Sequence, residues 1–458
     1  MIKNIEDFQN VFFIGVAGSG MSAVAQYLQG IGKSVSGSDR YFLPDTFNKT
    51  KQQLESAGIQ CYLQDGSGLS AETDLIVVSS AIEDTVFEVQ KGRELQIPFL
   101  KRSELLSLIA KSKKTIAVAG TSGKSTTSAM LYQILVDAKL EPSIISGAGL
   151  TSLIKQGKIG NAAVGKGDWL IIEADESDGS VVQYEPEIGL LLNIDKDHQE
   201  IDELLDLFSI FKSNTKGSFI VNQSNNLAKS LSANSENDFG FENKNAGYSA
   251  EDFKQDKFSL SFKVRNQKFE MTSLGQHSVE NATAAIAVAH QIGVDLDICA
   301  ESLKNYEGIY RRHQILGQKN GVWVIDDYAH NPAKCAASIK ACQPLAEKVI
   351  AWFQPHGYKP TRFLKDDFIE EIAEALRPQD EIWMSEIFYA GGTAVKDISA
   401  NELIDGIKAK GKTAYFVEDR NDLLETLRPE LKPGTVLLLM GASDPSLETF
   451  CANLFKNL

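Results

Sequence analysis

Short runs of β-branched and aromatic residues alternate with amphipathic helical patterns over most of the chain. The run VFFIGV at residues 11–16 has the composition of a buried strand, and the helical spacing that follows it places Met21, Val24, Ala25 and Leu28 on one face. The run TIAVAG at residues 115–120 is followed by a second apolar stripe of the same spacing. Strands that alternate with helices are typical of parallel sheets. We therefore predict an α/β fold with mainly parallel sheets.

The alternation restarts twice, which divides the chain into three predicted domains. The first, residues 1–107, has strands at VFFIGV, SVSGSD and DLIVVSSAI, and the second, residues 108–312, has them at TIAVAG, DWLIIEA and EIGLLLNI. The third, residues 313–458, has strands at VWVIDD, KVIAWF, EIWMSEIF, TAYFVE and TVLLLMGA. The polar stretch 223–257 is predicted to be a surface excursion with short strands after it. A chain of 458 residues is too long for one core, which agrees with several domains.

Composition limits the partners and the compartment. The formal net charge is −15, and a surface of this sign repels nucleic acid and anionic membranes, so neither is an expected partner. The five cysteines are scattered, which fits a reducing compartment and argues against a disulfide framework or a zinc site. The N-terminus lacks the layout of a secretion signal, and VFFIGVAGSGM is too short to span a membrane. The expected location is cytoplasmic.

The stretch VAGTSGKSTTSAM, residues 118–130, has the order that phosphate binding needs. Gly120 and Gly123 let backbone N–H groups approach an anion, and the following helix adds the positive end of its dipole. Lys124 supplies a charge for the outer phosphates, and Ser125 supplies a hydroxyl for Mg²⁺. The string is not a full GxxxxGK[ST], because Val118 stands at its first position. Phosphate binding is nevertheless favoured over a plain turn.

Acidic residues follow the next two predicted strands. WLIIEADESD offers Glu173, Asp175, Glu176 and Asp178, and LLLNIDKDH offers a further group that ends at His198. Charge runs are usually solvated loops. Here both groups stand at strand ends that converge on the ligand crevice of a parallel sheet, and magnesium prefers oxygen ligands. We therefore predict that some of these acids serve a bound nucleotide.

The first domain carries a second glycine-rich turn, GVAGSGMSAVA. Gly15, Gly18 and Gly20 join a strand to a helix, and Asp39 follows 19 residues after Gly20, where a dinucleotide fold places an acid that binds ribose. The order is GxxGxG rather than GxGxxG, so a nicotinamide cofactor is only weakly indicated and a tight turn is the plain alternative. A nucleotide diphosphate is the ligand class that fits.

Two histidine-bearing strand ends mark the third domain. VIDDYAHNP presents Asp327, Tyr328 and His330, and AWFQPHGYKPTR presents His356 and Arg362. A lone histidine is more often structural, but histidines at the ends of neighbouring strands favour a functional role.

These motifs together resemble the Mur ligases, the ATP-dependent amide-forming enzymes of peptidoglycan precursor synthesis. The resemblance covers essentially the whole chain, in order: GVAGSGMSAVA, VSGSD, VVSSAI, GTSGKSTT, EADESD, NIDKDH, HSVENATAAIAVA, YRRHQ, DDYAHNP and FQPHGY. It implies a Rossmann-like N-terminal domain, a central P-loop-type ATPase domain and a Rossmann-like C-terminal domain.

The resemblance also implies the site residues. The UDP of a sugar nucleotide is expected at Gly15, Gly18, Gly20, Met21, Asp39, Ser79, Ser80 and Arg102. ATP is expected at Gly120, Thr121, Gly123, Lys124, Ser125, Thr126, Asn281, Arg312 and Asp327, and Mg²⁺ at Ser125, Glu173 and His198. The amino acid is expected at Tyr328, His330, His356 and Arg362, and the implied catalytic residues are Lys124, His198, Arg312 and His330.

Among Mur ligases the chain is most similar to members that join L-alanine to the lactyl carboxylate of UDP-N-acetylmuramate. A carboxylate is a poor acylating agent, so ATP first converts it to an acyl phosphate, which the amine then attacks. The implied partners are small molecules, and the implied oligomeric state is a monomer or a homodimer.

The chain departs from these members at several positions. Ser122 and Asn331 stand where they have histidine, and Gly357 and Pro360 stand where they have arginines. Arginine forks are the natural grip for an α-carboxylate. The identity of the amine substrate therefore stays open between L-alanine and a recycled muropeptide. Ser177 stands where the muropeptide ligase usually has tyrosine, which favours L-alanine. A non-catalytic nucleotide-binding regulator is a further alternative. The retained Lys124 argues against it.

Overall fold

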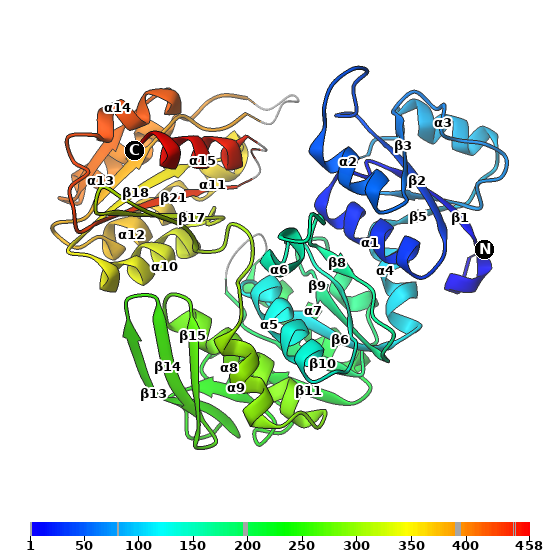
Figure 1. Cartoon of the computed structure of the whole chain (residues 1–458), viewed down its shortest axis with the longest axis horizontal. Coiled ribbons are helices and arrows are strands. Elements are labelled where there is room, and N and C mark those ends of the chain that lie inside the picture. Colours follow the sequence, from blue (N-terminus) through cyan, green and yellow to red (C-terminus); the bar gives the residue numbers. More distant parts are fainter. Residues whose placement is uncertain (1, 80–81, 196–199, 390–394, 443, 445) are drawn as a thin grey trace. The chain divides into compact units, whose positions relative to one another are not determined.

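The structure is a computed structural model that describes residues 2–79, 82–195, 200–389, 395–442, 444 and 446–458 (Figure 1). The chain divides into two compact units. The first comprises Met1–Asp252, Phe262–Glu270 and Val279–Tyr310, and the second comprises Phe253–Ser261, Met271–Ser278 and Arg311–Leu458. Three α/β portions with largely parallel sheets make up the chain, so the predicted fold class is confirmed. The boundaries at 107/108 and 312/313 stay predictions.

The first unit begins with a five-stranded parallel sheet. Its strands are β1 (Asn10–Ile14), β2 (Ser34–Asp39), β3 (Gln60–Leu63), β4 (Leu75–Val78) and β5 (Phe99–Lys101), in the order β3-β2-β1-β4-β5. The helices here are η1 (Ile5–Asp7), α1 (Ser19–Gly30), α2 (Lys49–Ser56), α3 (Phe87–Glu94) and α4 (Arg102–Lys111). Successive strand side chains point to opposite faces, so Val11 and Phe13 join one buried cluster and Phe12 and Ile14 join another. Both faces of the sheet are therefore covered.

A six-stranded sheet follows in the same unit. Its order is β11-β10-β6-β9-β7-β8, and every pairing is parallel except that of β7 with β8. The strands are β6 (Lys114–Ala119), β7 (Ser143–Ile145), β8 (Ala162–Ala163), β9 (Trp169–Ala174), β10 (Ile188–Leu191) and β11 (Ser218–Val221). The helices are α5 (Lys124–Asp137), α6 (Thr151–Ile154), η2 (Ser180–Gln183), α7 (Ile201–Asn214), η3 (Ala228–Leu231), α8 (Gln276–Gln291) and α9 (Leu296–Lys304).

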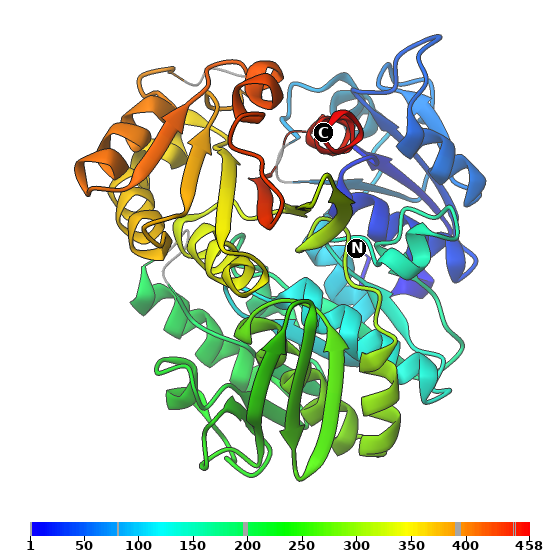
Figure 2. The same ribbon diagram turned by 60° about the vertical axis from the view of Figure 1, so that its left-hand side comes forward.

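A separate four-stranded sheet, in the order β12-β13-β14-β15, is drawn in green in Figure 2. Its strands are β12 (Phe239–Phe241), β13 (Tyr248–Asp256), β14 (Ser259–Val264) and β15 (Gln267–Thr272). The prediction that 223–257 is a surface excursion was therefore wrong in part, because β12 and β13 both lie inside it. These strands bury only alternate residues, such as Tyr248 and Ala250, so their hydrophobic pattern is weak in the sequence.

The second unit is built on a six-stranded sheet in the order β16-β17-β21-β18-β19-β20. Only the edge pairing of β16 with β17 is antiparallel. The strands are β16 (Gln314–Lys319), β17 (Val322–Asp327), β18 (Lys348–Gln354), β19 (Glu381–Met384), β20 (Thr413–Phe416) and β21 (Thr435–Gly441). The helices are α10 (Pro332–Cys342), η4 (Gln343–Leu345), α11 (Tyr358–Phe363), α12 (Lys365–Ala375), α13 (Ala400–Ala409), η5 (Arg420–Asp422), α14 (Leu423–Leu427) and α15 (Leu447–Asn457).

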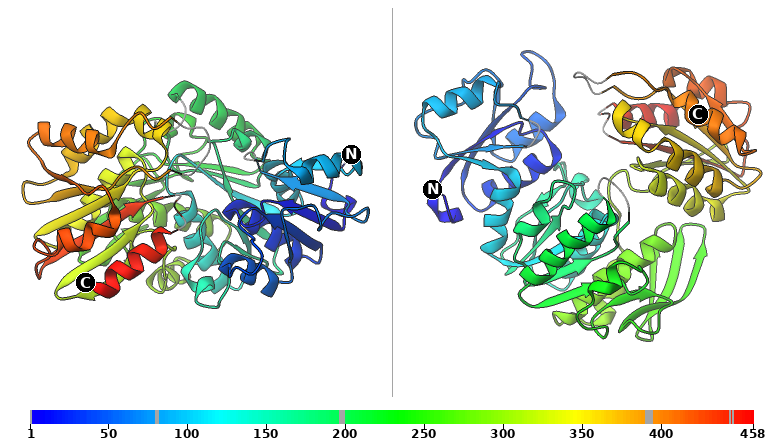
Figure 3. Two further views of the ribbon diagram at one scale, coloured as in Figure 1. Left: turned by 90° about the horizontal axis from the view of Figure 1, so that it is seen from above. Right: turned by 180° about the vertical axis from the view of Figure 1, so that it is seen from behind.

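Helices cover both faces of this last sheet. Ala351 and Phe353 of β18 pack in a core with α10, α12 and α13, while Ile350 and Trp352 pack in a second core with α14 and α15. Figure 3 shows α15, in red, on one side of the sheet. No helix in the described part of the chain is long and apolar enough to cross a membrane.

Segments of the four-stranded sheet pack in the second unit. Phe258, in the turn between β13 and β14, makes an edge contact with the Trp323 ring, with the ring centroids 4.8 Å apart. Leu274, after β15, is buried in the same core as Ile325 and Ile339. The second unit is thus assembled from three separate stretches of sequence.

Candidate functional site

The glycine loop of the first sheet lies at a topological switch point. β1 is flanked by β2 and β4, so the chain turns to opposite sides after β1 and leaves a crevice there. Gly15 has φ +86°, which favours glycine, and its N–H donates to Ser38 O at 2.8 Å. The Asp39 carboxylate accepts from Ala17 N at 3.0 Å and from Tyr41 N at 3.0 Å. Asp39 therefore fixes the backbone of the glycine loop.

Other predicted residues of the sugar-nucleotide site gather around this loop. Arg102 lies over the start of α1, since a Cβ added at Gly20 would stand 3.0 Å from Arg102 Cδ. Its guanidinium pairs with Asp178 at 3.2 Å. Met21 is buried in the core, and Ser79 directly follows β4. Ser80 lies outside the described residues.

The phosphate loop joins β6 to α5, as the sequence predicts. Gly120 and Gly123 have φ +129° and +86°, so only glycine is free of strain at these positions. Asn193, after β10, fastens the loop: its Oδ1 accepts from Ser122 N at 2.8 Å and from Thr121 Oγ1 at 2.9 Å. Thr126 lies in the first turn of α5.

Lys124 is the buried cation of this loop. Its Nζ donates to Gly120 O at 2.7 Å and to Glu176 Oε2 at 2.6 Å, and Asp175 stands 3.8 Å away. Burial opposes the charge, but the neighbouring carboxylates outweigh it and raise the pKa of Lys124. The ammonium group is therefore charged at neutral pH and lies against the backbone of the phosphate loop at Gly120.

The oxygen atoms beside Lys124 fit a magnesium ion. Ser125 Oγ donates to Glu173 Oε2 at 2.9 Å, and Glu173 Oε1 accepts from Ser146 Oγ at 2.6 Å and from Gly147 N at 2.8 Å. A carboxylate and a hydroxyl are hard oxygen donors of the kind that Mg²⁺ takes together with phosphate oxygens and water. His198, the third predicted ligand, lies outside the described residues. Among the residues that are described, three or more His, Cys, Asp or Glu side chains nowhere converge as a metal cage.

The remaining predicted ATP residues divide between the two units. In the first, Asn281 of α8 lies against the phosphate loop, since a Cβ added at Gly123 would stand 2.4 Å from its Oδ1. In the second, Asp327 ends β17 and accepts from His313 N at 3.0 Å and from the Ser338 hydroxyl. Burial would raise the pKa of Asp327, but His313, Arg312 and Ser338 together lower it. The guanidinium of Arg312 lies 5.0 Å from the Tyr328 ring centroid.

The structure brings three of the four predicted amino-acid residues together in the second unit. The rings of Tyr328 and His330 have centroids 5.7 Å apart, and those of His330 and His356 are 5.6 Å apart. His330 Nδ1 donates to Tyr328 O at 2.9 Å, because a carbonyl oxygen only accepts, and this leaves Nε2 as the basic nitrogen. Burial lowers the pKa of His330 to about 3, so the ring is neutral at physiological pH.

The fourth, Arg362 of α11, instead pairs with Asp397, and half of its side chain is exposed. Lys359 and Pro360 are exposed, and Gly357 turns the chain into α11 with φ +75°. Asn331 caps α10, where its side chain accepts from Lys334 N at 2.9 Å. Asn331 and Gly357 thus have local structural roles, at the starts of α10 and α11.

Two half-buried histidines, His277 and His330, predict a loss of stability in acid. Burial also lowers the pKa of His277, to about 4. Both folded-state values lie below that of an unfolded histidine, so the unfolded chain takes up protons first as the pH falls. Stability is complete above pH 6.5 and falls by about 1.4 kcal/mol per pH unit per histidine until the folded pKa is reached. Urea denaturation of wild type and His330→Asn between pH 7.5 and 4.5 tests this, and equal slopes for the two proteins would contradict it.

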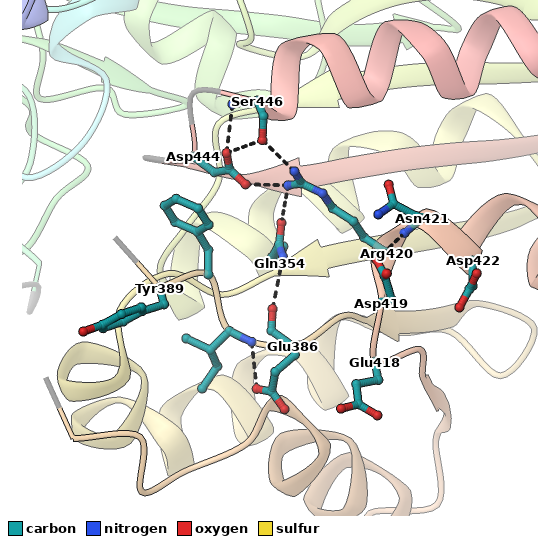
Figure 4. A pocket seen from close by; sticks show the side chains of 12 residues that line it. Gln354, Glu386, Tyr389, Glu418, Asp419, Arg420, Asn421, Asp422, Asp444 and Ser446 are labelled. Carbon is teal, nitrogen blue, oxygen red and sulfur yellow. Dashed lines mark hydrogen bonds and ion pairs between the residues drawn. The ribbon is translucent and has the colours of Figure 1, made fainter. Parts of the chain in front are cut away.

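A cavity of about 590 Å³ lies at the carboxyl ends of β18 to β21 (Figure 4), and one of its lining residues, Phe388, forms a backbone bridge with His356. Arg420 is the one cation among its twelve lining residues. Its guanidinium donates to Asp444 at 2.5 Å, Ser446 at 2.6 Å and Gln354 at 2.8 Å. Sequence reasoning missed Arg420 and the role of Asn193, because each acts across a separation of at least 24 positions.

Family models match most of the chain. The Mur ligase family catalytic domain matches residues 10–114, the Mur ligase middle domain matches 118–289, and the Mur ligase glutamate ligase domain matches 311–443. The UDP-N-acetylmuramate–L-alanine ligase of Syntrophomonas wolfei subsp. wolfei is 34% identical over 95% of this chain and 94% of that protein. The ligase of the same name from Dictyoglomus turgidum is 33% identical over 95% and 94%.

Solved structures agree. The UDP-N-acetylmuramate-alanine ligase of Thermotoga maritima has a TM-score of 0.79 and 26% identity, with 98% of each chain covered. A murein peptide ligase from Psychrobacter arcticus shares the fold, with a TM-score of 0.68, 20% identity, and 98% and 99% coverage. The order of sheets, the phosphate loop and the histidine-bearing strand ends are those of one family, and the chain belongs to the Mur ligases.

Proposed function

We propose that this protein joins L-alanine to the lactyl carboxylate of UDP-N-acetylmuramate, with ATP as co-substrate and Mg²⁺ as the metal. The observation that carries the proposal is the identity of 34% to a UDP-N-acetylmuramate–L-alanine ligase over 95% of the chain. ATP supplies the γ-phosphoryl group that converts the carboxylate into an acyl phosphate. The amine then attacks the carbonyl carbon, the C–O bond to phosphate breaks, and an amide and inorganic phosphate result.

The phosphate loop supports the first half of this reaction. Phosphoryl transfer needs positioning and neutralisation of charge more than covalent chemistry. Lys124 presents a charged ammonium group beside backbone N–H groups of a helix N-terminus. Ser125 and Glu173 would hold the metal, with His198 as the third ligand, and Asn281, Arg312 and Asp327 would complete the ATP site.

The sugar nucleotide is assigned to the first sheet. The glycine loop after β1 leaves backbone N–H groups at the switch point, and Arg102 lies over the helix that follows. A diphosphate at this loop would meet the guanidinium of Arg102, which is a matched donor for phosphate oxygens. Asp39, Ser79 and Ser80 would border the nucleoside.

The amine is assigned to the histidine cluster of the second unit. With Nδ1 held by Tyr328 O, the neutral His330 ring presents Nε2 as an acceptor for an N–H of the incoming amine. His356 and Tyr328 pack around it. The low pKa of His330 suits it to orient an amine rather than to retain the proton.

A second candidate keeps the sugar nucleotide but uses a muropeptide as the amine. The observation that favours it is local: Gly357 and Pro360 stand where arginine forks would bind an α-carboxylate, and Arg362 is engaged by Asp397. A larger amine has its carboxylates farther from the reacting nitrogen and does not need those arginines.

The two candidates separate in an assay of phosphate release. Purified protein is incubated with ATP, Mg²⁺ and UDP-N-acetylmuramate, and single amines are added: L-alanine, glycine, L-serine, D-alanine or a tripeptide that begins with L-alanine. We expect release that depends on L-alanine, with formation of the amide verified by mass spectrometry. Release with the tripeptide alone supports the second candidate. Nucleotide binding without any turnover would favour the regulator and contradict both.

The cytoplasmic location and the monomeric or homodimeric state stay predictions. Size-exclusion chromatography with light scattering tests the second.

A further inference from the structure

Asn161, which directly precedes β8, contacts the first turns of α1. Its Nδ2 donates to Ser19 O at 2.7 Å and lies 3.0 Å from Ser22 Oγ, and its Oδ1 accepts from Gln26 Nε2 at 2.8 Å. Ser19 belongs to the glycine loop assigned to the sugar nucleotide. Only 2% of Asn161 is exposed, so these hydrogen bonds are shielded from water.

The backbone of Asn161 leads to the other substrate site. Its carbonyl oxygen accepts from Ser146 N at 2.9 Å, beside the short antiparallel pairing of β7 with β8. The Ser146 hydroxyl donates to Glu173 Oε1 at 2.6 Å, and Glu173 Oε2 accepts from Ser125 Oγ at 2.9 Å. Ser146 is also 2% exposed. A continuous series of buried and partly buried hydrogen bonds thus runs from the glycine loop to the oxygen atoms assigned to magnesium.

The side chain of Asn161 is fully engaged in this series. Both Nδ2 hydrogens have an acceptor, and Oδ1 has a donor. The amide could therefore bind a ligand only through the second lone pair of Oδ1. Its role is therefore to hold other groups in place. Groups of this kind fix the orientation of metal ligands and of loops that bind substrate.

We propose that Asn161 is a positioning residue that couples binding of the sugar nucleotide to binding of Mg·ATP. A ligand that orders the glycine loop also orders Ser19 and Ser22, and through Asn161 and Ser146 it favours the rotamer of Glu173 that accepts from Ser125. The same hydrogen bonds act in the opposite direction, because coupling between two binding equilibria is reciprocal. The inference rests on the proposed function, since it takes the ligands of both loops from it.

The test measures binding rather than turnover. Titration calorimetry gives the Kd of the Mg²⁺ complex of a non-hydrolysable ATP analogue with and without saturating UDP-N-acetylmuramate. We expect the sugar nucleotide to tighten the wild-type Kd by about 5-fold or more. Asn161→Ala is expected to reduce the ratio of the two Kd values, without and with sugar nucleotide, to about 1. Ser146→Ala is expected to weaken the affinity for Mg²⁺ in analogue binding by about 10-fold.

Gln53→Ala is the matched control. Gln53 also joins the first sheet region to the second, through Gly157 O and Lys158 O at 3.2 Å each, but neither residue belongs to the hydrogen-bond series that ends at Glu173. Its coupling ratio is expected to equal that of wild type. Asn161→Asp keeps the acceptor for Gln26 and removes the donor to Ser19, so it carries the same test if Asn161→Ala does not fold.

The outcomes are distinguishable. A wild-type ratio retained in folded Asn161→Ala or Asn161→Asp overturns the inference and leaves the proposed function intact. A ratio lost equally in Gln53→Ala also overturns it, because any break between the two sheet regions would then suffice. Failure of wild type to bind UDP-N-acetylmuramate overturns the proposed function and the inference together.

Discussion

Lys124→Ala reduces amide formation by about 10²–10³-fold, the loss that follows removal of one preorganised group that stabilises charge in a transition state. Lys124 is the cation that the phosphate loop buries, and its Nζ is held between Gly120 O and Glu176. Without it, the transferred phosphoryl group would face the buried carboxylate of Glu176 with no opposing charge. Steady-state phosphate release at saturating substrates measures the loss.

Lys111→Ala is the matched control for this experiment. Lys111 also pairs with a glutamate, Glu185 at 2.9 Å, but both side chains are more than 40% exposed. Its turnover is expected to stay within about 2-fold of wild type, since exposed pairs contribute little. Melting curves verify that Lys124→Ala is folded. Undiminished turnover of folded Lys124→Ala would contradict the ATP assignment.

Arg311→Ala lowers the free energy of unfolding by about 3–5 kcal/mol, because it leaves a buried carboxylate without its partner. Arg311 Nε lies 3.0 Å from Asp326 Oδ2, and the two side chains are 8% and 4% exposed. Arg311 Nη2 also donates to Gly441 O at 3.0 Å, so the guanidinium joins β21 to the segment before β16. Urea denaturation of the full chain, followed by tryptophan fluorescence, measures the change.

Arg93→Ala provides the comparison. Arg93 pairs with Asp84 at 2.5 Å, but both side chains are largely exposed, and the expected loss is below about 1 kcal/mol. The double variant Arg311→Met with Asp326→Leu replaces the pair by apolar groups and is expected to recover most of the stability lost in Arg311→Ala. Equal losses in Arg311→Ala and Arg93→Ala would show that burial does not decide the effect.

Local sequence patterns predicted the fold class and the phosphate loop. The phosphate loop can be recognised in the sequence because its functional residues are contiguous. A strand, two glycines, Lys124 and Ser125 follow one another, and backbone geometry requires that order. The glycine loop after β1 can be recognised for the same reason. The four-stranded sheet was missed in part because strands that are half exposed lack a continuous hydrophobic run.

Residues that act across the chain could not be predicted. Asn193 fastens Ser122 from 71 positions away, and Asn161 reaches Ser19 from 142 positions away. Asn161 lies in no motif, and although Asn193 opens the motif NIDKDH, nothing in that motif shows that its side chain binds the phosphate loop. The motif YRRHQ contains two adjacent arginines whose roles the sequence does not distinguish. The structure shows that Arg311 donates to Asp326, while Arg312 lies over the Tyr328 ring.

The interleaved make-up of the second unit decides how it could be produced in isolation. A fragment that starts at Arg311 keeps its sheet but loses Phe253–Ser261 and Met271–Ser278, and with them the cover that Phe258 gives to Trp323 and the place of Leu274 in the core. Expressed alone, such a fragment would expose apolar surface that is buried in the full chain, and it would tend to aggregate. Circular permutation, or a short linker that joins Phe253–Ser261 and Met271–Ser278 to the rest of the unit, is the route to a well-behaved piece for crystallisation or inhibitor screening.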